Sequence, residues 1–280
     1  MPSAESRLGQ DRECQICSCG EIASVGTFQD WISVTQFSDA GGREVLEAMG
    51  GDSSLRRLEF MRCSGCGFIW VSPTPSEVDL AAFYRHYRGT TAYVAKRDKK
   101  IKRSLRRIRR LAKQVPGRRF LDVGCNVGFA VEAARLAGFT STGIDVDPHA
   151  VSLARAQFPE ASFHAGAVEA MVETGETFDL VHCSEVIEHL PDVRQFARAL
   201  ADLTRPGGAL FLTTPDAGHI RRPRNFLEWD AVKPPAHLCW FARRNVRMLF
   251  EGLGFDSIRF LFNFKPGIKM VAKKPRPDRS

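Results

Sequence analysis

Phe120-Leu121-Asp122-Val123-Gly124-Cys125-Asn126-Val127-Gly128 is a short apolar run that leads into a turn with two glycines. The segment 129–137 that follows has helical character and stops at Gly138, a common helix end. Gly124 can adopt a positive φ in the turn, and Gly128 lets the helix start close to a ligand. The stretch predicts a strand–turn–helix unit with a nucleotide-like ligand at its turn.

Short apolar segments continue to alternate with helices towards the C-terminus. Further strands are expected at 141–146, 162–165, 178–183 and 209–213, with helices from Pro148 and over 193–203. Such alternation indicates a parallel sheet covered on both faces. After a helix at 243–251, two β-rich runs are joined by Pro266-Gly267, which is too short for a parallel crossover. We predict a doubly wound α/β fold with a mostly parallel seven-stranded sheet and an antiparallel last strand.

Two acidic residues are placed to bind a cofactor. Asp122 precedes Gly124, and Asp145 lies at the end of the next strand. Open α/β sheets bind ligands beyond the carboxyl ends of their strands, where Asp145 can accept hydrogen bonds from both ribose hydroxyls. The dinucleotide fingerprint G-x-G-x-x-G is absent. An acid before the first glycine suits a cofactor with a cationic centre and no pyrophosphate.

From about Arg119 onwards the chain resembles the class I S-adenosylmethionine-dependent methyltransferases. The resemblance implies adenosylmethionine in the turn, its ribose on Asp145 and its adenine near Val146. The implied cofactor residues are Asp122, Gly124, Cys125, Gly128, Asp145, Val146, Ala167, Val168, Cys183 and Ser184. Asn126 stands where the family has a glycine, but Asn tolerates left-handed conformations, so we expect a retained site. The alternatives are a nicotinamide-binding Rossmann domain and an inactive relic.

The segment 184–190, Ser-Glu-Val-Ile-Glu-His-Leu, begins where the strand 178–183 ends. If it is helical, Glu185, Glu188 and His189 share one face and can hold a divalent metal ion. It resembles the E-x-x-E-H motif of ubiquinone-biosynthesis and small-RNA 2′-O-methyltransferases, which implies a magnesium or manganese ion, with His237 as a further ligand. Many related enzymes carry E-H-L without a metal, and there His189 lines the pocket or takes the acceptor's proton. The candidate catalytic residues are Glu188, His189 and His237.

Four of the eight cysteines form two C-x-x-C pairs, Cys14 with Cys17 and Cys63 with Cys66. Four thiolates with this spacing can reach one zinc ion at about 2.3 Å. Because no export signal precedes them, metal is favoured over disulfides. The run 62–75 resembles a bacterial arrangement in which a four-cysteine module precedes a methyltransferase domain, often in sugar, polysaccharide or natural-product tailoring. We predict a zinc-ribbon-like module at 12–75, linking helices at 76–115 and the methyltransferase domain at 116–275, with structural zinc.

Basic residues are concentrated between 96 and 119. This segment holds thirteen Lys and Arg against one acid, an excess of 12 where the whole chain carries +8. Apolar residues recur at helical spacing between them, which favours a solvated face of an amphipathic helix packed on the sheet. The alternatives are attraction of a small anionic substrate and binding of RNA phosphates. Few aromatic residues interleave with the cations, which counts against single-strand stacking.

No apolar run approaches the roughly 18 residues of a membrane span. We therefore expect a cytoplasmic enzyme, without a membrane partner, that methylates oxygen or carbon of a small metabolite. A nucleotide-linked sugar or a polysaccharide or natural-product intermediate would fit the cysteine module, and an anionic substrate would suit the basic segment. The alternative is a methyltransferase-fold protein that modifies or binds RNA. The irregular stretch 215–240, which contains Arg221, Arg222 and Arg224, is expected to cover the acceptor pocket.

Overall fold

The larger of two sheets contains the strand–turn–helix unit. In the computed structural model, which describes residues 13–34, 54–75, 80 and 97–276, its strand order is β10-β11-β8-β7-β4-β5-β6. The strands are β4 (Arg119–Val123), β5 (Thr140–Asp145), β6 (Ser162–Ala165), β7 (Phe178–Ser184), β8 (Thr204–Pro215), β10 (Ser257–Phe260) and β11 (Gly267–Lys273). β4 to β8 are parallel, and β11 pairs antiparallel with both β8 and β10. The predicted sheet and its antiparallel last strand are confirmed.

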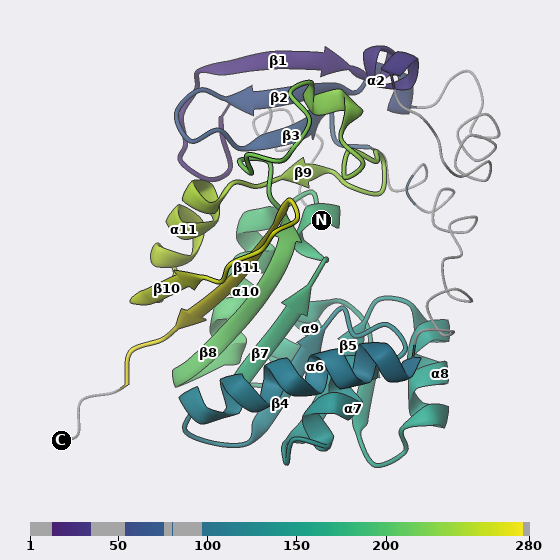
Figure 1. Ribbon diagram of the computed structural model, residues 1–280, viewed down its shortest axis with the longest axis vertical. Helices are drawn as coiled ribbons and strands as arrows, with labels where there is room; N and C mark the ends of the chain where they lie inside the picture. Colours follow the sequence, from purple (N-terminus) through teal and green to yellow (C-terminus); the bar gives the residue numbers. More distant parts are fainter. Residues whose placement is uncertain (1–12, 35–53, 76–79, 81–96, 277–280) are drawn as a thin grey trace.

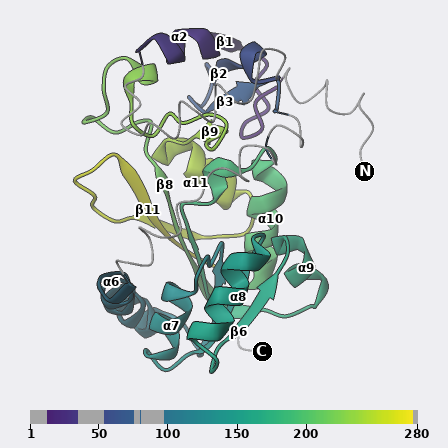
Figure 2. The same cartoon turned by 90° about the vertical axis from the view of Figure 1, so that its right-hand side faces the viewer.

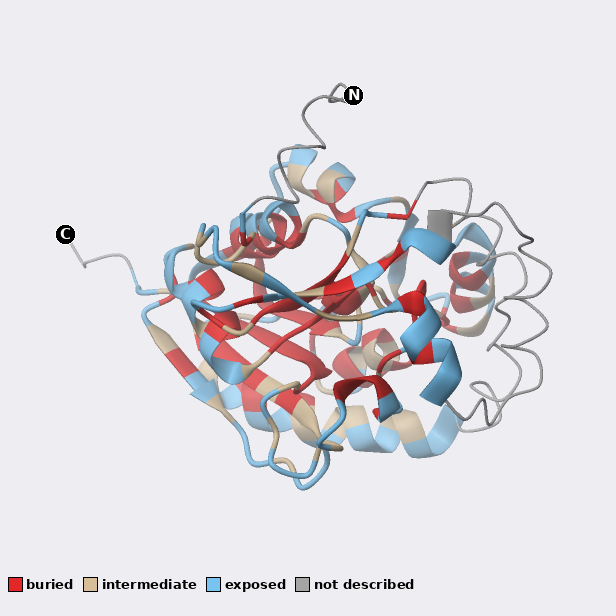
Figure 3. Cartoon of the chain, turned by 90° about the horizontal axis from the view of Figure 1, so that it is seen from above, coloured by how far each residue is buried: buried red, intermediate tan, exposed pale blue. Residues whose placement is uncertain are grey.

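Helices cover both faces of this sheet (Figure 1 and Figure 2). One face carries α6 (Arg97–Leu111), α7 (Phe129–Arg135) and α8 (Pro148–Gln157), and the other carries α9 (Val168–Glu173), α10 (Val193–Leu203) and α11 (Arg243–Glu251). Alternation along β4 explains this, because Phe120 faces α6 and α7 while Leu121 faces α10. The strands form the buried centre of the molecule (Figure 3).

Some elements differ from the predicted ranges. α6 ends at Leu111 and continues as a 3-10 turn, Ala112–Gln114. β8 begins at Thr204, ahead of Pro206-Gly207-Gly208, and its pairing with β7 is irregular there. The other helix expected between 76 and 115 lies outside the described residues. None of the described helices is both long and apolar enough to cross a bilayer.

A smaller antiparallel sheet lies at one end of the molecule (Figure 1). Its order is β1-β2-β3-β9, from β1 (Ile22–Thr27), β2 (Glu59–Cys63), β3 (Ile69–Ser72) and β9 (Cys239–Trp240). One side packs on α2 (Phe28–Val34) and on the 3-10 turn η4 (Phe226–Glu228), with Trp240 fully buried between them. Part of the irregular stretch 215–240 therefore shares its core with the N-terminal segment, although the two are far apart in the sequence.

Candidate functional site

The turn after β4 has the backbone that its glycines predict. Gly124 has φ 74° and Gly128 has φ 82°, and Asn126 adopts φ 48°, a left-handed conformation that Asn tolerates. The amide of Gly124 donates to the carbonyl of Ile144 at 2.9 Å, which ties the turn to β5. A Cβ on Gly124 would lie 2.3 Å from a methyl of Val186. The segment after β7 therefore packs directly against the turn.

Asp145 connects the turn to the loop after β5. Its carboxylate accepts hydrogen bonds from the amides of Asn126 at 2.7 Å and Asp147 at 3.0 Å. Burial raises the pKa of Asp145, although these two amides oppose the shift. Each carboxylate oxygen keeps a second lone pair that can accept from a ribose hydroxyl. Val146, the next residue, leaves 74% of its surface exposed, which suits an apolar platform for a flat ring.

Other predicted cofactor residues lie around the same edge of the sheet. Ala167 is the N-cap residue of α9 and is followed by the buried Val168, and the preceding Gly166 donates its amide to the Asp145 carbonyl at 2.9 Å. Cys125 and Cys183 have buried side chains. A contact from either cysteine to a cofactor would therefore come from its main chain.

Asp122 has a partner that the sequence analysis missed. His182 lies opposite it on β7 and donates from Nδ1 to Oδ1 of Asp122 at 2.6 Å. An arginine can only donate, so Nη1 of Arg107 gives its hydrogen to Nε2 of the same ring at 3.3 Å. The Asp122 carboxylate is therefore hydrogen-bonded to a buried ring that lies beneath α6. The signal in the sequence was a histidine within the run 178–183, whose only other polar residue is Asp179 near its start.

The segment after β7 is not the helix that would align Glu185, Glu188 and His189. Glu185 has φ 59°, and only Ile187–His189 forms a 3-10 turn. The structure instead brings together Glu188, His189 and His237, with one ligating atom of each within 4.8 Å of the others. We call these three residues the carboxylate–histidine cluster. His237 is held there because the Leu238 amide donates to the Glu188 carbonyl at 2.8 Å.

Both imidazoles of this cluster are neutral at neutral pH. Burial lowers the pKa of His189, and burial together with the neighbouring His189 lowers the pKa of His237 to about 3. Nδ1 of His189 donates to the Ala236 carbonyl at 2.6 Å, and Nδ1 of His237 donates to the Ala231 carbonyl at 2.7 Å. Each Nε2 is therefore unprotonated and able to accept a proton or bind a metal ion.

Glu188 is fully buried, and its surroundings favour a protonated or ligand-bound carboxyl group. Burial and the nearby Glu185 raise its pKa well above the ordinary value. Thr214 donates to Oε2 at 3.0 Å, while Oε1 has no hydrogen-bond partner among the described residues. Thr213 donates to Glu185 at 2.7 Å and lies 2.7 Å from the Ser184 hydroxyl. The two threonines of β8 were missed because a Thr-Thr pair in an apolar strand gives no distinct sequence signal.

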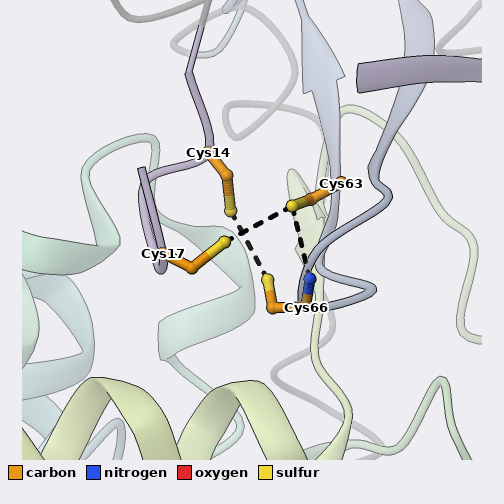
Figure 4. Close-up of side chains that lie close together, drawn as sticks. All are labelled: Cys14, Cys17, Cys63 and Cys66. Carbon is orange, nitrogen blue, oxygen red and sulfur yellow. Dashed lines mark hydrogen bonds between the residues drawn. The ribbon is translucent and has the colours of Figure 1, made fainter. Parts of the chain in front are cut away.

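The four paired cysteines meet in one cluster (Figure 4). The Sγ atoms of Cys14 and Cys66 are 3.5 Å apart, as are those of Cys17 and Cys63, and all four lie within 4.8 Å of one another. These separations exclude disulfides and are close to the edge of about 3.8 Å that four sulfurs form around zinc at 2.3 Å. A hydrogen bond from Cys66 lowers the pKa of Cys14 to about 5, which favours a thiolate. The residues present fit a zinc ion.

The first cysteine knuckle, residues 14–18, contacts the segment that follows His189. Gln15 donates its side-chain amide to the Pro191 carbonyl at 2.9 Å and accepts from the Val193 amide at 3.1 Å. Arg194 also bonds to the Gln15 carbonyl and to Ser18. These hydrogen bonds tie the position of the knuckle to that of residues 191–194.

Comparison with known proteins identifies the family. A family model described as "Methyltransferase domain" matches residues 93–259, more than half of the chain. The chain belongs to this methyltransferase family. The glycine turn and Asp145 of this domain suit the S-adenosylmethionine that the sequence resemblance implies.

The methyltransferase is 38% identical over 125 residues to a ubiquinone biosynthesis O-methyltransferase of Bordetella avium, covering 43% of this chain and 50% of that protein. It is 32% identical over 169 residues to the Rhizobium johnstonii protein of the same name, covering 59% and 66%. The chain thus spans about half the length of the first of these relatives.

Solved structures share the fold of the methyltransferase. A SAM-dependent methyltransferase from Archaeoglobus fulgidus has a TM-score of 0.51 at 16% identity, covering 66% of this chain and all of that one. An O-methyltransferase family protein from Burkholderia thailandensis has a TM-score of 0.53 at 15% identity, covering 69% and 63%. At these identities the likeness concerns the fold alone.

Proposed function

We propose that the methyltransferase methylates a small metabolite, with oxygen as the preferred acceptor atom and carbon as the alternative. The observation that carries this proposal is the carboxylate–histidine cluster. Two of its residues, Glu188 and His189, follow shortly after Val186, which packs against the Gly124–Gly128 turn. The sulfonium of adenosylmethionine is already reactive, so the protein needs mainly to align the acceptor and remove a proton. The relatives named as ubiquinone biosynthesis O-methyltransferases support oxygen.

His189 and His237 are the residues that we assign to proton removal. Each presents an unprotonated Nε2 whose orientation is fixed by a hydrogen bond from Nδ1 to a main-chain carbonyl. A neutral imidazole can accept the hydroxyl proton of an acceptor as the methyl group is transferred. The rings lie 4.8 Å apart and nearly perpendicular, so one acceptor can contact both.

The same cluster fits a divalent metal ion, which is the second candidate mechanism. Two imidazoles and a carboxylate are a common ligand set for such ions. Oε1 of Glu188 is buried without a hydrogen-bond partner among the described residues, and an ion would satisfy it. When bound, the ion would act as a Lewis acid on the acceptor hydroxyl.

The cofactor residues remain those that the resemblance implied, with Gly124, Gly128 and Asp145 supported by the turn geometry. We assign the four cysteines to a structural zinc ion that fixes the first knuckle against residues 191–194. Reduced cysteines and a zinc site fit the cytoplasm, where we place the enzyme.

The test uses the zinc-loaded chain, methyl-labelled adenosylmethionine and a size-fractionated bacterial extract. We expect label in the small-molecule fraction, and loss of labelling in His189→Gln without loss of the melting shift that adenosylhomocysteine produces. His164→Gln, a change at an exposed histidine of β6, is the matched control and should keep full activity.

Three outcomes separate the mechanisms and the acceptor class. Label in RNA instead of small molecules would reject the metabolite proposal. Activity that is lost with a chelator and restored by magnesium would favour the metal mechanism over proton removal by histidine alone. Full activity in both His189→Gln and His237→Gln would reject any role for the cluster in methyl transfer.

A further inference from the structure

A cavity of about 420 Å³ lies between the small sheet and the start of α11. Four arginines line it: Arg62 of β2, Arg222 and Arg224 of the stretch after β8, and Arg244 in the first turn of α11. We call it the arginine cavity. None of the described residues that line it is acidic. Its volume is within the range of roughly 300–1,000 Å³ that small-molecule sites occupy.

The four arginines have no carboxylate partner in the described part of the chain. Burial lowers the pKa of Arg222, and the nearby positive charge of Arg62 lowers it further. Asp216, next to the lining segment, is buried and pairs with Arg243, which does not line the cavity. Like charges gathered in a cleft create a positive potential that favours an anion.

One of these guanidinium groups is already held in place. Nε of Arg222 donates to the Ala217 carbonyl at 2.9 Å, and Nη1 donates to the Pro223 carbonyl at 2.8 Å. Two of its five N–H donors are used in this way, so the group is oriented and keeps donors for a ligand. A fixed planar guanidinium matches the geometry of a phosphate group, which it can bind through two parallel hydrogen bonds.

The wall of the arginine cavity is close along the chain to a residue that contacts the carboxylate–histidine cluster. Thr214 donates to Glu188, and Ala217, three residues later, lines the cavity. Three residues span at most about 11 Å of chain. The wall of the cavity and the residue that contacts Glu188 are therefore neighbours in the fold.

We propose that the arginine cavity binds the phosphate or diphosphate group of the methyl acceptor. This rests on the proposed function, because it assigns a charged group to the small metabolite. A cavity of this size favours a compact anion, whereas a nucleic-acid strand needs an extended basic groove with aromatic stacking platforms. Arg62 directly precedes Cys63, so a zinc ion on the cysteine cluster would also help to fix the main chain of this arginine.

The test is calorimetric titration of inorganic pyrophosphate into the zinc-loaded full chain at low ionic strength. The variant Arg62→Gln/Arg244→Gln removes two exposed arginines of the cavity, so it should fold normally. Loss of their charge-assisted hydrogen bonds should weaken binding by about tenfold or more. The matched control is Arg109→Gln/Arg110→Gln, which removes the same charge from the exposed face of α6 and should change binding by less than about twofold.

The outcomes are distinguishable. No binding to the unmodified chain, or equal weakening in both double variants, would overturn the proposal. A short single-stranded RNA that displaces pyrophosphate and binds the cavity variant more weakly would also overturn it, because the occupant would then be a nucleic acid. The melting shift with adenosylhomocysteine is recorded for every protein. Its absence from the unmodified chain would reject the proposed function without affecting the pyrophosphate result.

Discussion

Replacement of His182 by phenylalanine tests whether the buried pair with Asp122 supports the cofactor turn. Both residues leave only 4% of their surface exposed. The His182 ring stacks on Phe211, with centroids 5.3 Å apart, and lies 6.0 Å from Phe120. A phenyl ring of similar shape can keep these contacts. The substitution therefore removes mainly the hydrogen bond to Asp122 and the acceptor for Arg107.

The expected cost follows from the burial of the remaining carboxylate. Removal of the neutral donor to a buried carboxylate typically costs about 1.5–3 kcal/mol, because the carboxylate stays buried without its hydrogen bond. In a chain of this size that is a fall in melting temperature of roughly 5–10 °C. The double variant Asp122→Asn/His182→Phe should be more stable than His182→Phe by about 1 kcal/mol or more, since a neutral amide is less costly to bury than a carboxylate.

Thermal unfolding of the zinc-loaded chain, with and without adenosylhomocysteine, measures these effects. Asp122 lies two residues before Gly124, so His182→Phe should also reduce the melting shift that the ligand produces. His164→Phe, at an exposed position, is the control and should change stability by less than about 0.5 kcal/mol. A loss below about 1 kcal/mol in His182→Phe, or strictly additive effects in the double variant, would refute this reasoning.

Three further predictions concern the turn, the cysteine cluster and the histidines. Gly124→Ala should abolish the melting shift with adenosylhomocysteine, because its Cβ would lie 2.3 Å from a methyl of Val186. Gly175→Ala is the control: Gly175 has a similar positive φ but open space around it, so this variant should keep the melting shift. Cys66→Ser should lose the bound zinc measured by metal analysis and melt earlier, whereas Cys19→Ser, outside the cluster, should keep the zinc. His237 has a folded pKa of about 3 against about 6.5 unfolded, so the unfolded chain binds the proton first as pH falls. The contribution of His237 to the free energy of unfolding should therefore fall by about 2 kcal/mol between pH 7 and pH 5. In urea unfolding, the free energy of unfolding of His237→Gln should fall less over this pH range than that of the unmodified chain.

Each of these has an outcome that contradicts it. Equal ligand response in the two glycine variants would show that the valine contact does not shape the turn. Full zinc content in Cys66→Ser would remove that cysteine from the ligand set. An unchanged pH dependence in His237→Gln would mean that this ring is not buried in its neutral form.

Local sequence determined the sheet and the cofactor turn. Apolar runs, helix ends and the two glycines are properties of neighbouring residues, so the parallel strands, the Gly124–Gly128 turn and the left-handed Asn126 were predictable. The paired cysteines were equally local signals, since two-residue spacing already brings two sulfurs together. Asp145 could be proposed as a ligand residue from the sequence because the end of a strand in an α/β sheet is a known ligand position.

Tertiary packing decided which distant residues share a site. His237 reaches Glu188 and His189 only because β9 pairs with β3 and its preceding residue bonds to the Glu188 carbonyl. The predicted helical face that included Glu185 does not form, because Glu185 itself has a left-handed backbone conformation. The chain turns there and packs Val186 against Gly124. Neither periodicity nor spacing encodes such contacts, because they depend on how separate elements fill space together. The same is true of the arginine cavity, whose four cations come from three elements that meet only in the folded chain.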